Sequence, residues 1–120
     1  MYRAEKRERH RFPIALPIEY CRIDSDSRSN FHLGYTVNAS EEGLMVVSRD
    51  EIPAESDVGI KVFFCSPDLR WVEAQSYVVW KVKNEETSNY LSGIKIMRAG
   101  QEDLREWEQF LDNLSSLRPF

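Results

Sequence analysis

The sequence is poor in cysteine, glycine and proline, and these shortages narrow the class of protein. Among 120 residues there are two cysteines, five glycines and five prolines. Cys21 and Cys65 are far apart and lie in apolar stretches, which is typical of buried thiols in a reducing compartment. The glycines and prolines form no linker or low-complexity tract. With 42% hydrophobic residues, the chain has enough apolar content for one domain without disulfides.

Long hydrophobic runs are also missing. No apolar stretch approaches the roughly 20 residues that a membrane helix needs. The N-terminal segment is basic and contains no apolar core, so it does not fit a secretory signal. We therefore expect a cytoplasmic protein that has no membrane partner.

The sequence offers little for catalysis or for metal binding. His10 and His32 show no metal-ligand spacing with the two cysteines, so no metal site is expected. No serine or cysteine stands in a nucleophile motif, and the acidic residues form no recognisable acid/base pair. These observations predict that the protein is not an enzyme and has no cofactor.

Charge is unevenly distributed along the chain. The net charge is −4, but five basic and two acidic side chains give residues 1–11 a charge of +3, which leaves −7 for the rest. An acidic body argues against a broad nucleic-acid interface. A short basic arm fits a small, local anion site, although a solvated tail would have the same composition.

Six segments have the composition and alternation of β-strands, and one has the period of a helix. The strands are expected near residues 14–20, 31–37, 44–47, 58–64, 71–82 and 90–97. Because proline cannot donate to a sheet, Pro13 and Pro17 place the first strand at an edge or a bulge. In the fifth strand, alternation puts six residues on one face: Val72, Ala74, Ser76, Val78, Trp80 and Val82.

The last segment carries apolar residues at spacings of three and four, which is typical of an amphipathic helix. Its stripe consists of Leu104, Trp107, Leu111 and Leu114. The expected fold is mainly β, a six-stranded antiparallel β-barrel with a C-terminal α-helix. The expected organisation is a flexible arm (residues 1–12), the barrel (13–98) and a helix packed on it (99–120).

Two short patterns suggest a ligand site. Arg7 and Arg11 are four residues apart, and two planar guanidinium groups can bind phosphates and the edge or face of a purine. Asn38, Ser40 and Gly43 form an Asn-x-Ser-x-x-Gly turn, whose amide and hydroxyl can bind a base edge. Gly43 would permit a left-handed turn or a close backbone approach. Each pattern alone also fits an ordinary arm or an ordinary turn.

Together, the two patterns resemble the PilZ family. The resemblance extends to residues 11–14 at the entry into the first strand, to residues 43–46 after the turn, and to the hairpin containing residues 78–80 and 91–96. It implies a six-stranded barrel that binds the bacterial second messenger cyclic di-GMP. It also implies that Arg7 and Arg11 grip phosphate and guanine, that Asn38 and Ser40 contact a guanine, and that Gly43 shapes the loop. Asn38 replaces the family's commoner aspartate, which predicts weaker binding.

Several other residues are weaker candidates for ligand contacts. Lys6, Arg9 and His10 could add to the attraction for phosphate. Trp80 could stack on the ligand, although a tryptophan in an alternating strand is more typical of the core. Gly93 is expected to relieve crowding between backbones.

The resemblance implies a receptor whose arm reorders on binding and signals to an unidentified protein partner, with the chain a monomer or weak dimer. A PilZ-like protein–protein adaptor that binds no nucleotide remains the alternative.

Overall fold

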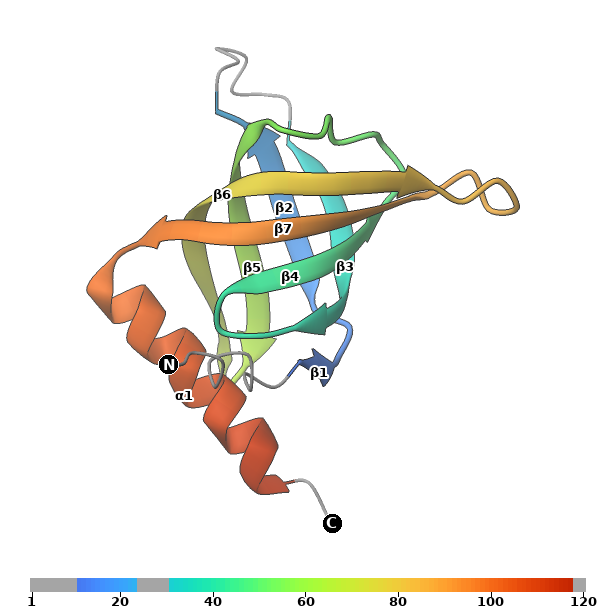
Figure 1. The fold of residues 1–120 in the computed structure, drawn as a ribbon. Coiled ribbons are helices and arrows are strands. Elements are labelled where there is room, and N and C mark those ends of the chain that lie inside the picture. The colour runs from blue at the N-terminus through green and yellow to red at the C-terminus, as the bar shows by residue number, and fades with distance from the viewer. Residues whose placement is uncertain (1–10, 24–30, 118–120) are drawn as a thin grey trace, which may run out of the picture.

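The computed structural model describes residues 11–23 and 31–117. Within these residues the chain forms seven strands and one helix (Figure 1). The strands are β1 (Phe12–Pro13), β2 (Pro17–Arg22), β3 (His32–Ala39), β4 (Gly43–Ser48), β5 (Asp57–Cys65), β6 (Leu69–Lys83) and β7 (Tyr90–Ala99). The helix α1 spans Gln101–Leu117.

Six of the strands close into an antiparallel barrel. Neighbours follow the order β3-β2-β5-β6-β7-β4, and a further pairing between β3 and β4 completes the ring. The two-residue β1 pairs with β3 alone, at the end of β3 beyond its pairing with β2. The predicted six-stranded barrel with a C-terminal helix is therefore confirmed.

The first predicted strand, near residues 14–20, corresponds to β2, and the short β1 precedes it. β2 pairs with β3 on one side and with β5 on the other, so the expectation of an edge strand is wrong for this segment. Pro17 is the first residue of β2, a position where a missing N–H group costs the sheet little. Pro13 lies in β1, which is paired on one side only.

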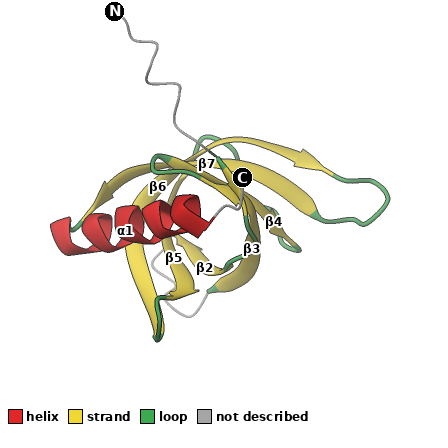
Figure 2. Cartoon of the chain, turned by 90° about the horizontal axis from the view of Figure 1, so that it is seen from below, coloured by secondary structure: helices red, strands yellow, loops and turns green. Residues whose placement is uncertain are grey.

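Helix α1 closes one end of the barrel, as Figure 2 shows from below. Its apolar stripe is directed inward: Trp107, Phe110 and Leu111 are buried. The rings of Trp107 and Phe110 lie 6.0 Å and 4.4 Å from that of Phe64 on β5. The first helical hydrogen bond runs from the N–H of Leu104 to the carbonyl of Gly100. Among the described residues, no helix is long and apolar enough to cross a membrane.

Burial on β3 is a finding of the structure, and one expectation about burial, that of the cysteines, is wrong. On β3 the apolar side chains Leu33, Tyr35 and Val37 face outward, while Thr36 is fully buried. Cys65 is exposed and Cys21 half-buried, so these thiols are not the core residues that their apolar surroundings suggested; both are free.

Thr36 faces the core because its hydroxyl holds the segment between β1 and β2. The hydroxyl donates to the carbonyl of Ile14 and accepts from the N–H of Leu16 at 2.8 Å. The backbone N–H of Thr36 also donates to the carbonyl of Leu16 at 2.9 Å. These bonds hold the chain against β3 at the point where it enters the barrel.

Replacing Thr36 with valine should lower the free energy of unfolding by about 1–3 kcal/mol, because the buried N–H of Leu16 loses its acceptor without a change in side-chain volume. Urea denaturation would measure the loss. Thr36→Ser keeps the hydroxyl and should recover most of it; equal losses in both variants would show that the methyl group, not the hydrogen bonds, matters.

Candidate functional site

The predicted turn and the end of the N-terminal arm meet at β3. Phe12 and Pro13 of β1 pair with Ala39 and Asn38 of β3. Immediately before β1, the Nη1 of Arg11 donates a hydrogen bond of 3.1 Å to Oδ1 of Asn38. One residue from each sequence pattern is thus in direct contact, and Arg11 is exposed to solvent.

A β-bulge gives Asn38 its outward direction. Residues two apart in a regular strand face the same side, so Asn38 would point into the core with Thr36. The register between β3 and β4 instead shifts between these two residues, with Thr36 opposite Val46 and Asn38 opposite Met45. The extra residue, Val37, reverses the alternation and leaves Ala39 buried. The Nδ2 of Asn38 contacts Sδ of Met45 at 3.6 Å on the outer surface.

A second bulge acts on Trp80 in the same way. The register of β6 with β7 shifts between Val78, opposite Ile94, and Trp80, opposite Gly93. Val78 is fully buried, whereas Trp80 is 37% exposed and Val82 57% exposed. The expectation that all six alternating residues share one face fails beyond Val78, and the core assignment of Trp80 is wrong.

Gly93 leaves the space that the Trp80 ring occupies. A Cβ atom at this position would lie 2.3 Å from Nε1 and 2.4 Å from Cε2 of Trp80. The indole therefore lies directly against the backbone of β7. The crowding that Gly93 relieves is between a ring and a strand, not between two backbones as its sequence context suggested.

The two bulges align the polar and aromatic residues of the candidate site. Asn38 is opposite Met45, Met45 is opposite Gly93, and Gly93 is opposite Trp80. We call these four residues, on β3, β4, β7 and β6, the ligand row. The next row along the strands faces inward, since Thr36, Val46 and Ser92 are fully buried. The ligand row is thus an outward strip across four strands, with Arg11 at one end and Trp80 at the other.

The rest of the turn is built into the fold. Ser40 is 6% exposed; its hydroxyl donates to the carbonyl of Gly43 and accepts from the N–H of Glu42, both at 3.4 Å. The indole Nε1 of Trp107 donates to the carbonyl of Ser40 at 3.2 Å, which ties α1 to the turn. The role of Ser40 as a ligand contact remains a prediction, because here its hydroxyl serves the turn.

Gly43 is needed for close packing between strands. A Cβ atom there would lie 2.6 Å from the carbonyl oxygen of Ile94 on β7. Of the two possibilities raised by the sequence, close backbone approach is the one found, since none of the described glycines has a positive φ.

Three residues of the site were not predicted to belong to it. Met45 and Gly93 belong to the ligand row only because of strand register. Trp107 was predicted as a core residue, and it is one, but it also anchors the turn; its indole N–H, which needs an acceptor when buried, was the available hint. Arg7, Lys6, Arg9 and His10 lie outside the described residues.

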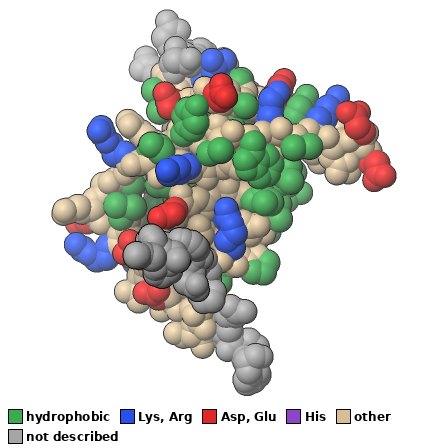
Figure 3. All heavy atoms as spheres, in the orientation of Figure 1, with side chains coloured by type: hydrophobic (Ala, Val, Ile, Leu, Met, Phe, Trp, Pro, Cys, Tyr) green, Lys and Arg blue, Asp and Glu red, His purple; other side chains and the backbone are tan. Residues whose placement is uncertain are grey.

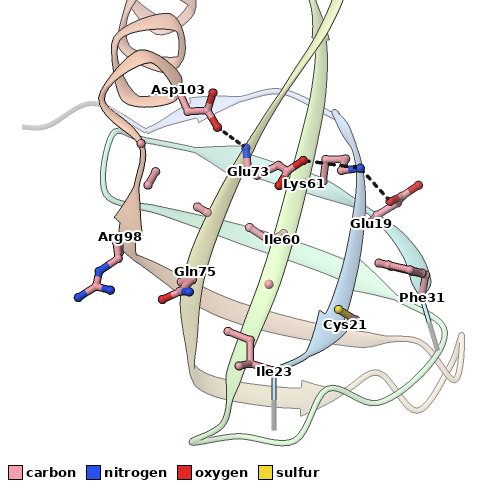
Figure 4. A pocket seen from close by; sticks show the side chains of 14 residues that line it. Glu19, Cys21, Ile23, Phe31, Ile60, Lys61, Glu73, Gln75, Arg98 and Asp103 are labelled. Atoms are coloured by element: carbon pink, nitrogen blue, oxygen red, sulfur yellow. Dashed lines mark hydrogen bonds and ion pairs between the residues drawn. The ribbon is translucent and has the colours of Figure 1, made fainter. Parts of the chain in front are cut away.

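A groove of about 600 Å³ lies on the opposite side of the barrel, on β2, β5 and β6 near the start of α1 (Figure 4). Lys61 lies at its upper edge, 3.8 Å from carboxylate oxygens of both Glu19 and Glu73. Phe31 and Ile23 line other edges. None of the residues predicted to bind ligand lines this groove, so we place the candidate site on the ligand row.

Burial raises the pKa of Tyr20 above its usual value, with a smaller contribution from the nearby carboxylate of Asp50; a hydrogen bond with Ser48 acts in the opposite direction. The Tyr20 hydroxyl donates to the backbone carbonyl of Asp50 at 3.3 Å, and its ring stacks on His32. Tyr20 therefore stays neutral and supports the barrel rather than the ligand row.

The chain is similar to known proteins over most of its length. It spans 54% of the Bacillus subtilis inhibitor of motility (MotI/DgrA), and all of this chain is covered, with a TM-score of 0.76 and 11% identity. The PilZ domain of CeSA from a cellulose-synthesizing bacterium matches 88% of this chain and 98% of its own, with a TM-score of 0.61 and 14% identity. At such identities these likenesses show the fold alone.

No curated protein matches the sequence. The family model described as PilZ domain matches residues 5–113, a range that includes the arginine pair, the turn and most of α1. The chain therefore belongs to the PilZ domain family.

Proposed function

We propose that this protein is a receptor that binds cyclic di-GMP on the ligand row, between the row and the N-terminal arm. PilZ domains are receptor and adaptor domains rather than enzymes, and the family is associated with this ligand. The observation that carries the proposal is the 3.1 Å contact between Arg11 and Asn38, because it joins the two family motifs at one end of an exposed strip.

Arg11 has the chemistry to hold a phosphate. A guanidinium carries five N–H donors, and the bond to Asn38 uses one of them. Since Asn38 is uncharged, it orients Arg11 without neutralising its positive charge. The remaining donors are free to form charge-assisted bonds to phosphate oxygens, which are stronger than neutral ones.

Arg7 is proposed to supply the second guanidinium. Arg7 lies four positions before Arg11, and four extended residues span about 13–14 Å, which is enough to reach across a ligand lying on the row. Lys6, Arg9 and His10 would add to the positive charge around the phosphates. Ordering of the arm over the ligand would change the surface that a protein partner meets. A cytoplasmic location, where a soluble second messenger is available, belongs to the same proposal.

Trp80 is proposed to stack on a guanine at the far end of the row. Its indole lies against Gly93 and is 37% exposed, so one ring face is supported. Stacking of a base on an aromatic side chain contributes about 1–3 kcal/mol. Asn38 would contact a base edge through its amide, and Ser40 and Gly43 would hold the turn in place.

Calorimetric titration with cyclic di-GMP tests this function. We expect saturable binding at ligand concentrations of tens of micromolar or below. Such concentrations correspond to a standard free energy of binding of about −6 to −8 kcal/mol. No saturable heat would favour the alternative, a PilZ adaptor that works through protein contacts without nucleotide.

Replacing Gly93 with alanine should weaken cyclic di-GMP binding about tenfold, because the new methyl group displaces the Trp80 ring and its stacking contribution is lost. The fold should tolerate the change, since Trp80 is exposed and can move. The matched control is Gly59→Ala, whose Cβ would meet only Ile23, at 4.0 Å. Equal affinity of both variants would remove Trp80 from the site.

A further inference from the structure

A second outward strip runs beside the ligand row and is entirely apolar. Tyr35, Val47, Leu91 and Val82 are consecutive partners across β3, β4, β7 and β6. Leu33 and Val37 extend this strip along β3. We call these six residues the outer apolar face. Figure 3 shows hydrophobic side chains gathered on this side of the molecule, next to the protruding β6–β7 hairpin.

Most side chains of this face are well exposed to solvent. Leu33 is 71% exposed, Val82 57% and Tyr35 49%. Together with the ligand row, the face presents roughly 500 Å² of apolar surface, taking about 150–250 Å² for a whole aromatic side chain and less for Leu and Val. The largest exposed apolar patch of a typical monomer covers about 300–600 Å², so this patch is near the upper end of that range. It is also more than half of the ~800 Å² of surface that each partner buries in a standard interface.

Charged side chains lie at both ends of the face, including Lys83 beside the hairpin tip and Glu41 and Glu42 beside Gly43. The tip of the β6–β7 hairpin carries Glu85 and Glu86, both exposed, and Figure 3 shows acidic side chains there. Toward the other end, Lys95 is exposed on β7, opposite Gly43. Lys95 lies four residues beyond Leu91, or about 13 Å along the strand. A two-fold axis near Leu91 would therefore bring each acidic tip toward Lys95 of the other copy.

We propose that the outer apolar face is the interface of a homodimer in the ligand-free protein. A two-fold dimer uses the same patch on both copies, so the patch must complement itself. An uncharged strip with Glu85 and Glu86 at one end and Lys95 at the other meets that requirement, whereas a strongly acidic or basic partner would find no end of uniform charge. The dimer forms through the sheet and leaves α1 on its own barrel.

Because the outer apolar face lies beside the ligand row, we expect ligand binding and dimer formation to compete. This expectation rests on the proposed function. Met45 of the ligand row and Val47 of the outer apolar face are two residues apart on β4, or about 7 Å. A ligand bound on the row would occupy space that the second copy needs. Cyclic di-GMP is therefore expected to dissociate the dimer, which would convert ligand binding into a change of assembly.

Sedimentation velocity of the full chain without ligand tests the interface. We expect a concentration-dependent dimer whose dissociation constant rises at least about 30-fold in Val82→Glu, because a carboxylate would be buried at the interface. The matched control is Leu69→Glu on the same strand, where an apolar side chain is 64% exposed outside the face. Its dimer should be unchanged. A monomer at all concentrations, or a dimer equally affected by both variants, would overturn the proposal.

Two further measurements complete the test. The double variant Glu85→Lys/Glu86→Lys should weaken the dimer, and addition of Lys95→Glu should restore it; absence of this rescue would overturn the two-fold arrangement. Adding cyclic di-GMP to wild type should shift sedimentation toward monomer. A dimer that persists with bound ligand would overturn the competition. If calorimetry shows no binding, the ligand-free experiments still decide the interface.

Discussion

Replacing Arg11 with alanine is expected to weaken cyclic di-GMP binding by about 5- to 150-fold, the equivalent of about 1–3 kcal/mol for a lost charge-assisted contact. Two effects combine in this variant. The phosphate loses a guanidinium, and Asn38 loses the donor that orients its amide at 3.1 Å. Calorimetric titration of the variant would measure the change, and Arg7→Ala is expected to lose a similar amount.

Matched controls distinguish the loss of a specific ligand contact from the loss of positive charge on the arm. Arg3→Ala removes the same charge from the same arm but lies outside the motif, so it should change affinity less than about threefold, as a screened distant charge does. Arg11→Lys keeps the charge but not the planar fork, and should recover only part of the loss. If neither Arg7→Ala nor Arg11→Ala changed affinity, the site assignment would be wrong even with the fold established.

Replacing Trp107 with alanine is expected to give the largest loss of stability, about 3–5 kcal/mol, as for other buried large-to-small changes. The ring packs against Phe64 and Phe110 and is 2% exposed. The loss is a large part of the 5–15 kcal/mol that stabilises a typical domain. Chemical denaturation followed by circular dichroism would measure it.

Trp107→Phe distinguishes packing from anchoring of the turn. Phenylalanine keeps most of the ring contact but leaves the carbonyl of Ser40 without its 3.2 Å donor, so we expect a loss of about 1–3 kcal/mol. Ligand affinity should fall as well, because the turn next to Asn38 is less fixed. Glu108→Ala, on the exposed side of α1, is the control. An affinity unchanged in Trp107→Phe would show that the helix does not support the site.

Local patterns in the sequence were sufficient to predict the elements of the fold. Each of the six predicted strands coincides with one strand of the barrel, because alternation of apolar residues reports a half-buried strand directly. The helix was equally clear from the spacing of Trp107 and Leu111, both of which are buried. The family resemblance, carried by the arginine pair and the turn, is confirmed by the PilZ match.

The geometry of the site could not be predicted, because it depends on two bulges. A bulge is a property of pairing between strands, and a single strand's alternation does not record it. Val37 and Val79 are the extra residues; in regular strands without the bulges, Asn38 and Trp80 would face the core. The buried face of β3 could not be predicted for a related reason: alternation identifies two faces but not which one is buried, and here Thr36 is buried while Tyr35 is exposed.

The most direct test of the account is to map where cyclic di-GMP contacts the protein, using ¹H–¹⁵N NMR spectra recorded during a titration. We expect the largest shifts at the side-chain amide of Asn38, the backbone amides of Met45 and Gly93, and the indole of Trp80. The groove around Gly59 and Cys21, on the other side of the barrel, should show little change. Shifts confined to that groove, or no shifts at saturating ligand, would contradict a receptor site on the ligand row.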